Sequence, residues 1–299
     1  MPWSTASAPP PDLPLLGRGA IVTGVSRRRG IGFAVAVRFA ELGANVFIHH
    51  FAPNDAEQPW GADDLDEVRA GIRSALVDGA RFGDLGADMA DPLAPLRIVD
   101  AAVAAIGPVR ILISNHAKSG GDGSLFDMTP YSLDIHWQVN TRSTLLLTRH
   151  FAEQFSRATV GERMTKPGVR PTSLRPLDEF ATGRVIWMTS GQHDGPMPGE
   201  VAYATSKAAL AGITATVASE LLDHGILLNT VNPGPVNTGY LDPETTDRPL
   251  DDLLAQLATT PFGRFGLPGD PARLISWLVS DEARWIVGQV LTTDGGFRL

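Results

Sequence analysis

Short apolar and β-branched segments alternate along the chain with longer segments whose apolar residues recur every three or four positions. The first pattern is typical of buried strands and the second of amphipathic helices. Their regular alternation indicates a parallel sheet with helices on both faces. We therefore expect a single α/β domain built on a doubly wound parallel sheet of about seven strands.

The expected elements have the following bounds. Strands are predicted at Ala20–Thr23, Asn45–His50, Val109–Asn115, Arg184–Thr189, Leu227–Asn232 and Gln289–Thr292. A weaker strand is predicted at Arg81–Leu85, where nearby glycines disfavour extended pairing. Helices are predicted at Ile31–Leu42, Pro92–Ile106, Ser132–Phe155, Val201–Leu222 and Pro271–Leu278.

Three segments depart from this alternation. Residues 1–16 are rich in Pro, Ser and Ala and are expected to form a disordered leader before the domain at 17–299. Ala52–Asp66 is acidic, contains two prolines, and is predicted to be a loop leading into a helix. Thr159–Thr182 is a polar insertion, which a right-handed crossover places at the edge of the sheet opposite the ligand.

Composition restricts the partners. A net charge of −8 and a pI near 5.3 disfavour nucleic acid and anionic membranes, because both require a basic protein face. The chain contains no cysteine, which excludes disulfides and thiolate chemistry. It has no apolar run near the roughly 20 residues of a membrane span, and its first residues lack a signal-peptide pattern. We expect a cytoplasmic protein that acts on a small molecule.

A glycine-rich turn follows the first predicted strand. Thr23-Gly24 and Gly30-Ile31-Gly32 flank it, and an apolar-periodic helix begins directly afterwards. Glycines permit close backbone approach, and the start of a helix offers free N–H groups to a pyrophosphate. Alone, the same pattern also fits an ordinary strand-to-helix turn.

A second candidate site lies near the expected helix Val201–Leu222. Tyr203 and Lys207 have the i, i+4 spacing that places both side chains on one helix face, where an ammonium favours the phenolate form of a tyrosine. The alternative is a partly buried tyrosine beside a surface lysine. Ser190 follows the strand Arg184–Thr189, and the carboxyl ends of parallel strands face the ligand crevice. Its hydroxyl is therefore placed to bind a substrate carbonyl oxygen.

Together these residues resemble the short-chain dehydrogenase/reductase family, from about Gly17 to the end of the sequence. The resemblance implies a Rossmann-type fold in which Tyr203 is the general acid/base and Ser190 orients the carbonyl. It implies that Lys207 assists the tyrosine and holds the nicotinamide ribose. Asn140 matches the family asparagine that holds a water for proton relay.

The resemblance also implies a set of cofactor contacts. They fall on Gly24, Ser26, Arg27, Arg28, Arg29, Gly30, Ile31, Gly32, His50, Asp88, Met89, Asn115, His116, Ala117, Tyr203, Lys207, Pro233, Gly234, Val236 and Thr238. Two features depart from the family pattern. Five residues separate Gly24 from Gly30, a spacing similar to enoyl-acyl-carrier-protein reductases, and His116 stands where the family has a smaller residue.

The expected cofactor is NADP(H), with NAD(H) as the alternative. NAD-specific folds place a carboxylate at the end of the second strand, whereas here His49-His50-Phe51 precede the first carboxylate, Asp55. The arginines at 27–29 are candidates to pair with a 2′-phosphate, although exposed loop arginines are also commonly just solvated. His49 and His50 should point to opposite strand faces, so we expect no shared metal.

The sequence thus predicts an oxidoreductase that interconverts a ketone, such as a 3-oxoacyl thioester, and a secondary alcohol. The alternatives are an enoyl-thioester reductase and a non-catalytic NADP-sensing protein. The substrate pocket is expected from Gln192–Val201 and Gly239–Pro261; His193 is either part of it or an exposed loop residue. Apolar positions on the helices Ser132–Phe155 and Val201–Leu222 fit a homo-oligomer, a dimer or tetramer, as well as a monomer core.

Overall fold

The computed structural model describes residues 12–155, 183–246 and 249–299 and contains a seven-stranded parallel sheet of order β3-β2-β1-β4-β5-β6-β7. The predicted insertion Thr159–Thr182 lies outside the described residues. The strands are β1 (Gly19–Val22), β2 (Asn45–His50), β3 (Phe82–Gly86), β4 (Val109–Ser114), β5 (Gly183–Met188), β6 (Ile226–Asn232) and β7 (Val290–Thr292). The doubly wound fold predicted from the apolar pattern is therefore confirmed, including the weak third strand.

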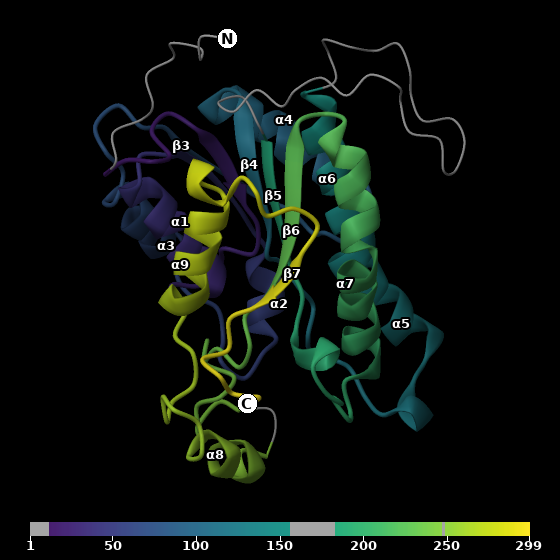
Figure 1. Cartoon of the computed structure of the whole chain (residues 1–299). Helices are drawn as coiled ribbons and strands as arrows, with labels where there is room; N and C mark the ends of the chain where they lie inside the picture. The colour runs from purple at the N-terminus through teal and green to yellow at the C-terminus, as the bar shows by residue number, and fades with distance from the viewer. Residues whose placement is uncertain (1–11, 156–182, 247–248) are drawn as a thin grey trace.

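Helices cover the two faces of the sheet (Figure 1). One face packs α1 (Ile31–Glu41) and α9 (Gly269–Leu278), with α3 (Leu65–Arg73) beside α1. The other packs α4 (Ala94–Ile106), α6 (Ser143–Glu153) and α7 (Val201–Leu222). Each helix buries its apolar stripe, and β1, β4, β5 and β6 are buried on both sides, as expected for strands between two helical layers.

The predicted helix Ser132–Phe155 is interrupted. It begins earlier, as α5 (Pro130–His136), because Thr129 forms a capping box with Ser132 and Pro130 fits the first turn. A π-helical segment, η2 (Trp137–Arg142), then precedes α6. The Thr144 hydroxyl donates to the Asn140 carbonyl at 2.8 Å, which satisfies an acceptor within the widened turns. Such segments occur frequently at functional sites.

Other boundaries also differ from the predictions. Leu15, assigned to the disordered leader, is fully buried in the core, and its N–H donates to the Leu42 carbonyl. The predicted loop Ala52–Asp66 contains a short helix, α2 (Ala52–Ala56), before α3 begins. A further short helix, α8 (Asp251–Leu257), was not predicted, because its apolar residues are too few to show a helical period.

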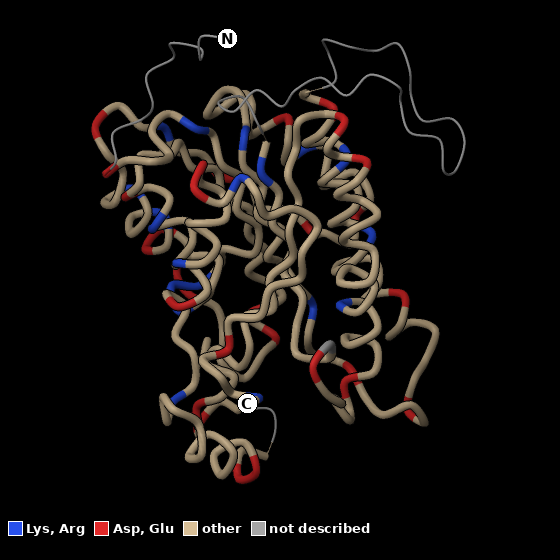
Figure 2. The backbone as a smooth tube through the Cα atoms, in the orientation of Figure 1, with Lys and Arg blue, Asp and Glu red and all other residues tan. Residues whose placement is uncertain are grey.

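The sheet order reverses between β1 and β4, the switch point at which open α/β sheets bind ligands beyond the carboxyl ends of the strands. Basic and acidic residues are both scattered over the backbone in Figure 2. Among the helices of the described segments, none combines the length and apolar character that crossing a bilayer requires.

Candidate active site

A cavity of about 530 Å³ opens at this switch point. The loops that follow β1 to β6 form its walls. Sixteen residues singled out from the sequence line it: Gly24, Ser26, Arg27, Gly30, Ile31, Asp88, Met89, Asn115, His116, Ala117, Ser190, Tyr203, Pro233, Gly234, Val236 and Thr238. Six others do not contribute to the wall: Arg28, Arg29, Gly32, His50, Asn140 and Lys207.

The glycine-rich turn requires its glycines for close approach. Gly24 has φ +71°, and a Cβ there would lie 2.8 Å from the His116 Cα. A Cβ on Gly32 would lie 2.6 Å from the Gly24 carbonyl oxygen, so Gly32 supports the turn from behind the cavity wall. Gly30 precedes α1 and no side chain caps the helix, which leaves the first N–H groups of α1 available at the cavity.

Two buried histidines form the floor beneath this turn. His49 accepts the Gly24 N–H through Nδ1 at 3.3 Å, and its Nε2 donates to the Ala87 carbonyl at 2.8 Å. Burial lowers the pKa of His49 to about 4, so the ring stays neutral at neutral pH and fits this single tautomer. The His116 ring lies 6.0 Å from it and bridges Thr23 and Ser143 at 2.7 Å each. Burial also lowers the pKa of His116.

The second strand directs its adjacent histidines to opposite sides. His49 faces the cavity, whereas the His50 ring contacts Asp84 at 3.0 Å. The prediction that His50 contacts cofactor is therefore not supported by its position. Within residues 12–155, 183–246 and 249–299, no three potential ligands cluster closely enough to hold a metal.

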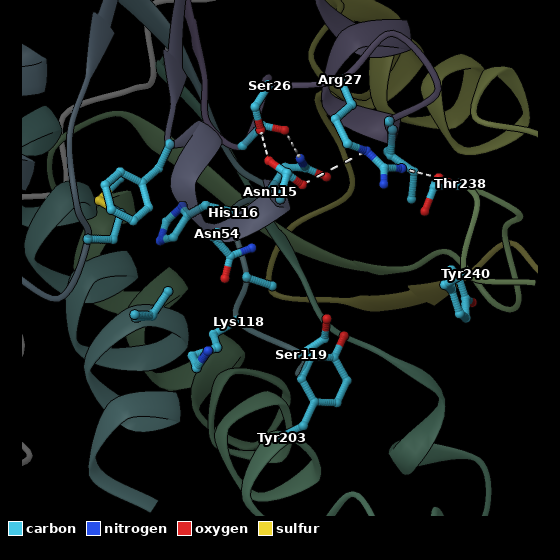
Figure 3. Close-up of a pocket in the computed structure, with 18 of the residues that line it drawn as sticks. Ser26, Arg27, Asn54, Asn115, His116, Lys118, Ser119, Tyr203, Thr238 and Tyr240 are labelled. Carbon is cyan, nitrogen blue, oxygen red and sulfur yellow. Dashed lines mark hydrogen bonds and ion pairs between the residues drawn. The ribbon is translucent and has the colours of Figure 1, made fainter. Parts of the chain in front are cut away.

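We call Ser190, Tyr203, Lys207 and Asn140 the tyrosine cluster. Tyr203 projects from the first turn of α7 into the cavity (Figure 3). Ser190 lies on the loop after β5 and also lines the cavity. The Lys207 ammonium lies 5.8 Å from the Tyr203 ring centroid and donates to the Met188 carbonyl at 2.9 Å. Burial lowers the pKa of Lys207 to about 8. The Lys207 ammonium is therefore held behind the cavity wall, next to the Tyr203 ring.

Asn140 fixes the backbone that follows β4. Its Oδ1 accepts the Lys118 N–H at 2.7 Å, and its Nδ2 donates to the Lys118 carbonyl at 3.0 Å and to Ser206 Oγ at 2.9 Å. These bonds tie η2, the cavity loop and α7 together. Asn140 is fully buried and its polar groups bond to Lys118, Ser206 and Thr144, so it acts here as an anchor for the loop.

Asp122 is a site residue that the sequence analysis missed. Its carboxylate accepts the N–H of Ala202 at 3.0 Å and that of Tyr203 at 2.7 Å. It therefore caps α7 from a distant loop, at the turn that carries Tyr203. An aspartate next to glycines is a common turn residue, so the local sequence gave no signal of this long-range cap.

The opposite end of the cavity contains a group that we call the arginine cluster: Ser26, Arg27, Asp55 and Trp60. The Ser26 hydroxyl donates to Asp55, and Arg27 Nε lies 3.9 Å from the same carboxylate. Arg27 Nη2 donates to the Thr238 carbonyl (Figure 3). The Arg27 guanidinium lies 5.6 Å from the Trp60 ring centroid. Arg27 Nη1 is buried and has no partner among the described residues.

The arginine cluster corrects two expectations. The segment after β2 supplies a carboxylate after all, because α2 returns Asp55 to the glycine-rich turn. Burial raises the pKa of Asp55, and Ser26 and Arg27 oppose that shift. Arg28 and Arg29 lie outside the cavity wall: Arg28 pairs with Glu67 at 2.8 Å, and Arg29 with Asp242 at 2.7 Å.

The substrate side of the cavity draws on both predicted segments. Met197 and Glu200 come from Gln192–Val201, and Tyr240 comes from Gly239–Pro261. The structure does not describe the His193 side chain. The sequence analysis missed Lys118, Ser119, Tyr131, Ile135 and Val139, which also line the cavity. Ile135 and Val139 were predicted only as part of the long amphipathic helix Ser132–Phe155, and Tyr131 lies just before that helix.

Comparisons with known proteins were made on sequence and on structure. The profile of the family described as enoyl-(acyl carrier protein) reductase matches residues 24–165 and 173–298. The chain is 34% identical over 278 residues to the uncharacterized oxidoreductase YjdA of Bacillus subtilis, covering 93% of this chain and 96% of that protein. It is 32% identical over 297 residues to an Arabidopsis thaliana NADPH-dependent aldehyde reductase-like chloroplastic protein, covering 98% of each.

Solved structures also resemble this chain, in both fold and sequence. A short-chain dehydrogenase from Burkholderia cenocepacia in complex with NADP superposes with a TM-score of 0.73 at 31% identity, over 95% of this chain and 99% of that one. A short-chain dehydrogenase/reductase from Serratia marcescens gives a TM-score of 0.74 at 30% identity, over 96% of this chain and 100% of that one.

Proposed function

The chain belongs to the short-chain dehydrogenase/reductase family and is an oxidoreductase, and from this we propose that it interconverts a ketone or aldehyde and an alcohol with NADP(H). The observation that carries the proposal is the tyrosine cluster, in which a cavity tyrosine lies over a buried lysine. A 3-oxoacyl thioester is one substrate of this class.

The cavity fits a nicotinamide dinucleotide. The uncapped start of α1 and the close glycine turn suit a pyrophosphate, and the unpartnered Nη1 of Arg27 suits an anionic group. We assign the pyrophosphate to Gly24, Gly30 and Ile31, and the 2′-phosphate to Arg27. Asp88 and Met89 would hold the adenine, while Asn115, Ala117, Pro233, Gly234 and Val236 would border the nicotinamide end.

Each member of the tyrosine cluster then has a chemical role. When bound, the nicotinamide supplies or accepts the hydride. Ser190 donates a hydrogen bond to the substrate oxygen, which gains negative charge as the carbonyl is reduced. Tyr203 gives that oxygen its proton and takes it back in the reverse reaction. The Lys207 ammonium favours the phenolate that remains, and Asn140 keeps the adjoining loop in place.

The cofactor preference follows from the arginine cluster. A guanidinium with an unpartnered Nη1 can form a charge-assisted bond to a 2′-phosphate, which is stronger than the bond it can donate to a neutral ribose hydroxyl. NADPH-dependent and NADP-bound relatives are consistent with this assignment. Asp55 weakens the preference because its carboxylate competes for the same guanidinium.

The proposed function is tested by incubating the purified protein and its Tyr203→Phe variant with NADPH and a panel of carbonyl compounds, following the absorbance of the reduced cofactor. The phenylalanine keeps the ring but removes the transferable proton, so turnover should fall by about 10² to 10⁴. Cofactor binding should stay within a few-fold. A variant retaining more than about a tenth of wild-type turnover would exclude Tyr203 as the acid/base.

The same panel includes an enoyl thioester, because the longer glycine loop and the description of the matching family are shared with enoyl reductases. The Tyr203–Lys207 spacing and Ser190 favour the carbonyl reaction. Oxidation of NADPH only with the enoyl compound would establish the alternative. Tight NADPH binding without oxidation by any compound would instead indicate a sensor.

We also propose that the protein works in the cytoplasm as a homo-oligomer. The homo-oligomer is supported by a hollow of about 220 Å³ on the α5 and α7 face, lined by Leu133, Trp137, Ala202 and Thr205 among others. Trp137 is 46% exposed and Leu133 40% exposed, and both line the same hollow, as is typical of a contiguous apolar patch at a protein–protein interface. Light scattering of the full chain measures the oligomeric state directly, and a monomer at every concentration would contradict the proposal.

A further inference from the structure

The loop after β5 contains a slot formed by two glycines, and a distant arginine fills it. A Cβ on Gly191 would lie 2.6 Å from Arg298 Nη2, and a Cβ on Gly195 would lie 2.9 Å from Arg298 Nη1. Neither glycine has a positive φ, so neither is required by its backbone conformation. The absence of side chains at both positions therefore matters for the guanidinium, which could not occupy the slot otherwise.

Hydrogen bonds and charge hold Arg298 in this slot. Nη2 donates to the Gly191 carbonyl at 2.8 Å, and Nε lies 3.8 Å from the Asp194 carboxylate. The Gly191 carbonyl also accepts the N–H groups of Asp194 at 2.9 Å and Gly195 at 3.2 Å, which closes the turn. Asn232, at the end of β6, donates to Asp194 from the other side. Arg298, in the segment after β7, and Asn232, at the end of β6, therefore both bind the loop that follows β5.

This loop starts at Ser190 and continues to Met197, both of which line the cavity. We propose that Arg298 is a positioning residue for substrate: by filling the Gly191–Gly195 slot, it fixes the loop that places Ser190 and the Met197 wall. The inference rests on the proposed function, because its effect on kinetics requires a carbonyl substrate. Arg298 does not line the cavity, so it acts through the loop and leaves the cofactor end unaffected.

The test uses Arg298→Ala, Gly195→Ala and the double variant in the full chain. An alanine methyl at 195 displaces the guanidinium from the slot, so both single variants should raise KM for the best carbonyl substrate about tenfold. The double variant should raise KM no further, because the second change removes an interaction that is already lost. The dissociation constant of NADPH should stay within about twofold in all three, a change well below that expected for a lost charged contact.

Two controls separate a positioning role from general damage. Gly269→Ala is a matched substitution, because a Cβ there meets nothing within 4 Å, and it should leave KM unchanged. Arg298→Lys keeps the charge beside Asp194 but cannot place two nitrogens against the two glycines, so it should resemble Arg298→Ala. A lysine variant equal to wild type, or additive effects of Gly195→Ala and Arg298→Ala on KM, would overturn the proposal.

A second measurement tests the slot without depending on turnover. The free energies of unfolding of the same variants should also be non-additive, since both changes disrupt one contact. If the wild-type protein reduces no carbonyl compound, the proposed function fails, while this coupling still tests the slot. Additive effects of Arg298→Ala and Gly195→Ala on the free energy of unfolding would show that the two residues do not interact, whatever compound the enzyme reduces.

Discussion

The tyrosine cluster and the arginine cluster lie at opposite ends of one cavity but are fixed by different kinds of partner. At the first, side chains bond to backbone: Lys207 to the Met188 carbonyl and Asn140 to both polar groups of Lys118. At the second, side chains also depend on other side chains: Ser26 donates to Asp55, and Arg27, which donates to the Thr238 carbonyl, forms an ion pair with the same carboxylate. Backbone groups are present whatever the sequence, whereas a charged side-chain partner must be supplied by one particular residue.

This difference indicates which property of the protein is easier to change by substitution. Substitutions around the tyrosine cluster leave its backbone partners in place, so its geometry depends mainly on the cluster residues themselves. The arginine cluster depends on the course of residues 51–63, which supply Asp55 and Trp60 to its wall. Cofactor preference should therefore be easier to alter by substitution than the acid/base chemistry.

After Tyr203, the largest expected effect is at Lys207. Burial lowers its pKa to about 8, so the ammonium is present below about pH 8 and lost above it. Wild-type kcat in the reducing direction should fall as pH rises through this value. Lys207→Met should lower kcat by about 10² or more and abolish this alkaline decline. Rate profiles against pH for both proteins provide the measurement, and a decline that persists in the variant would assign it to another group.

Arg27→Ala comes next and tests the other end of the cavity. Loss of a charge-assisted bond should weaken NADPH binding by about 10- to 100-fold while NADH binding changes little. Asp55→Asn should act in the opposite sense, because the amide keeps an acceptor for Ser26 but no longer competes for the guanidinium. Titration calorimetry with both cofactors measures the two dissociation constants.

The double variant Arg27→Ala/Asp55→Asn is the control, since Arg27→Ala alone leaves Asp55 without its charged neighbour. It should bind the two cofactors with similar affinity. Equal weakening of NADPH and NADH binding by Arg27→Ala would show that the arginine holds the fold of the turn, and the contrast between the two clusters would then disappear.

How much of the site could be predicted from sequence depends on how local each contact is. Tyr203, Lys207 and Ser190 were found because helical spacing and the strand-end rule are local and periodic. Asp55 was counted as too late in the sequence to reach the second strand's end, since the turn of α2 that returns it depends on tertiary packing. Asp122 and Arg298 act on elements far from them in sequence, and no local pattern marks such contacts.

A smaller effect is expected at Asp122. Asp122→Ala removes the cap from α7 and should lower the free energy of unfolding by about 1 kcal/mol. It should also reduce kcat, because the freed N–H groups belong to the turn that carries Tyr203. Asp122→Asn retains one acceptor oxygen and should recover most of both quantities. Denaturant unfolding and steady-state kinetics give the comparison; an alanine variant with normal stability and kcat would contradict the capping role.

The smallest effects are expected at Arg28 and Arg29, which flank the arginine cluster in sequence. Their side chains are 52% and 61% exposed, and each already pairs with a surface carboxylate. Exposed pairs of this kind contribute about 0 to 1 kcal/mol, because water and side-chain entropy offset most of the attraction. Arg28→Ala and Arg29→Ala should therefore change the ratio of NADPH to NADH dissociation constants by less than about twofold. Since all three arginines carry the same charge on the same loop, a small effect at 28 and 29 beside a large one at 27 would show that burial, not proximity alone, selects the phosphate-binding residue. A loss of preference in either exposed variant would place the 2′-phosphate at the rim of the loop instead.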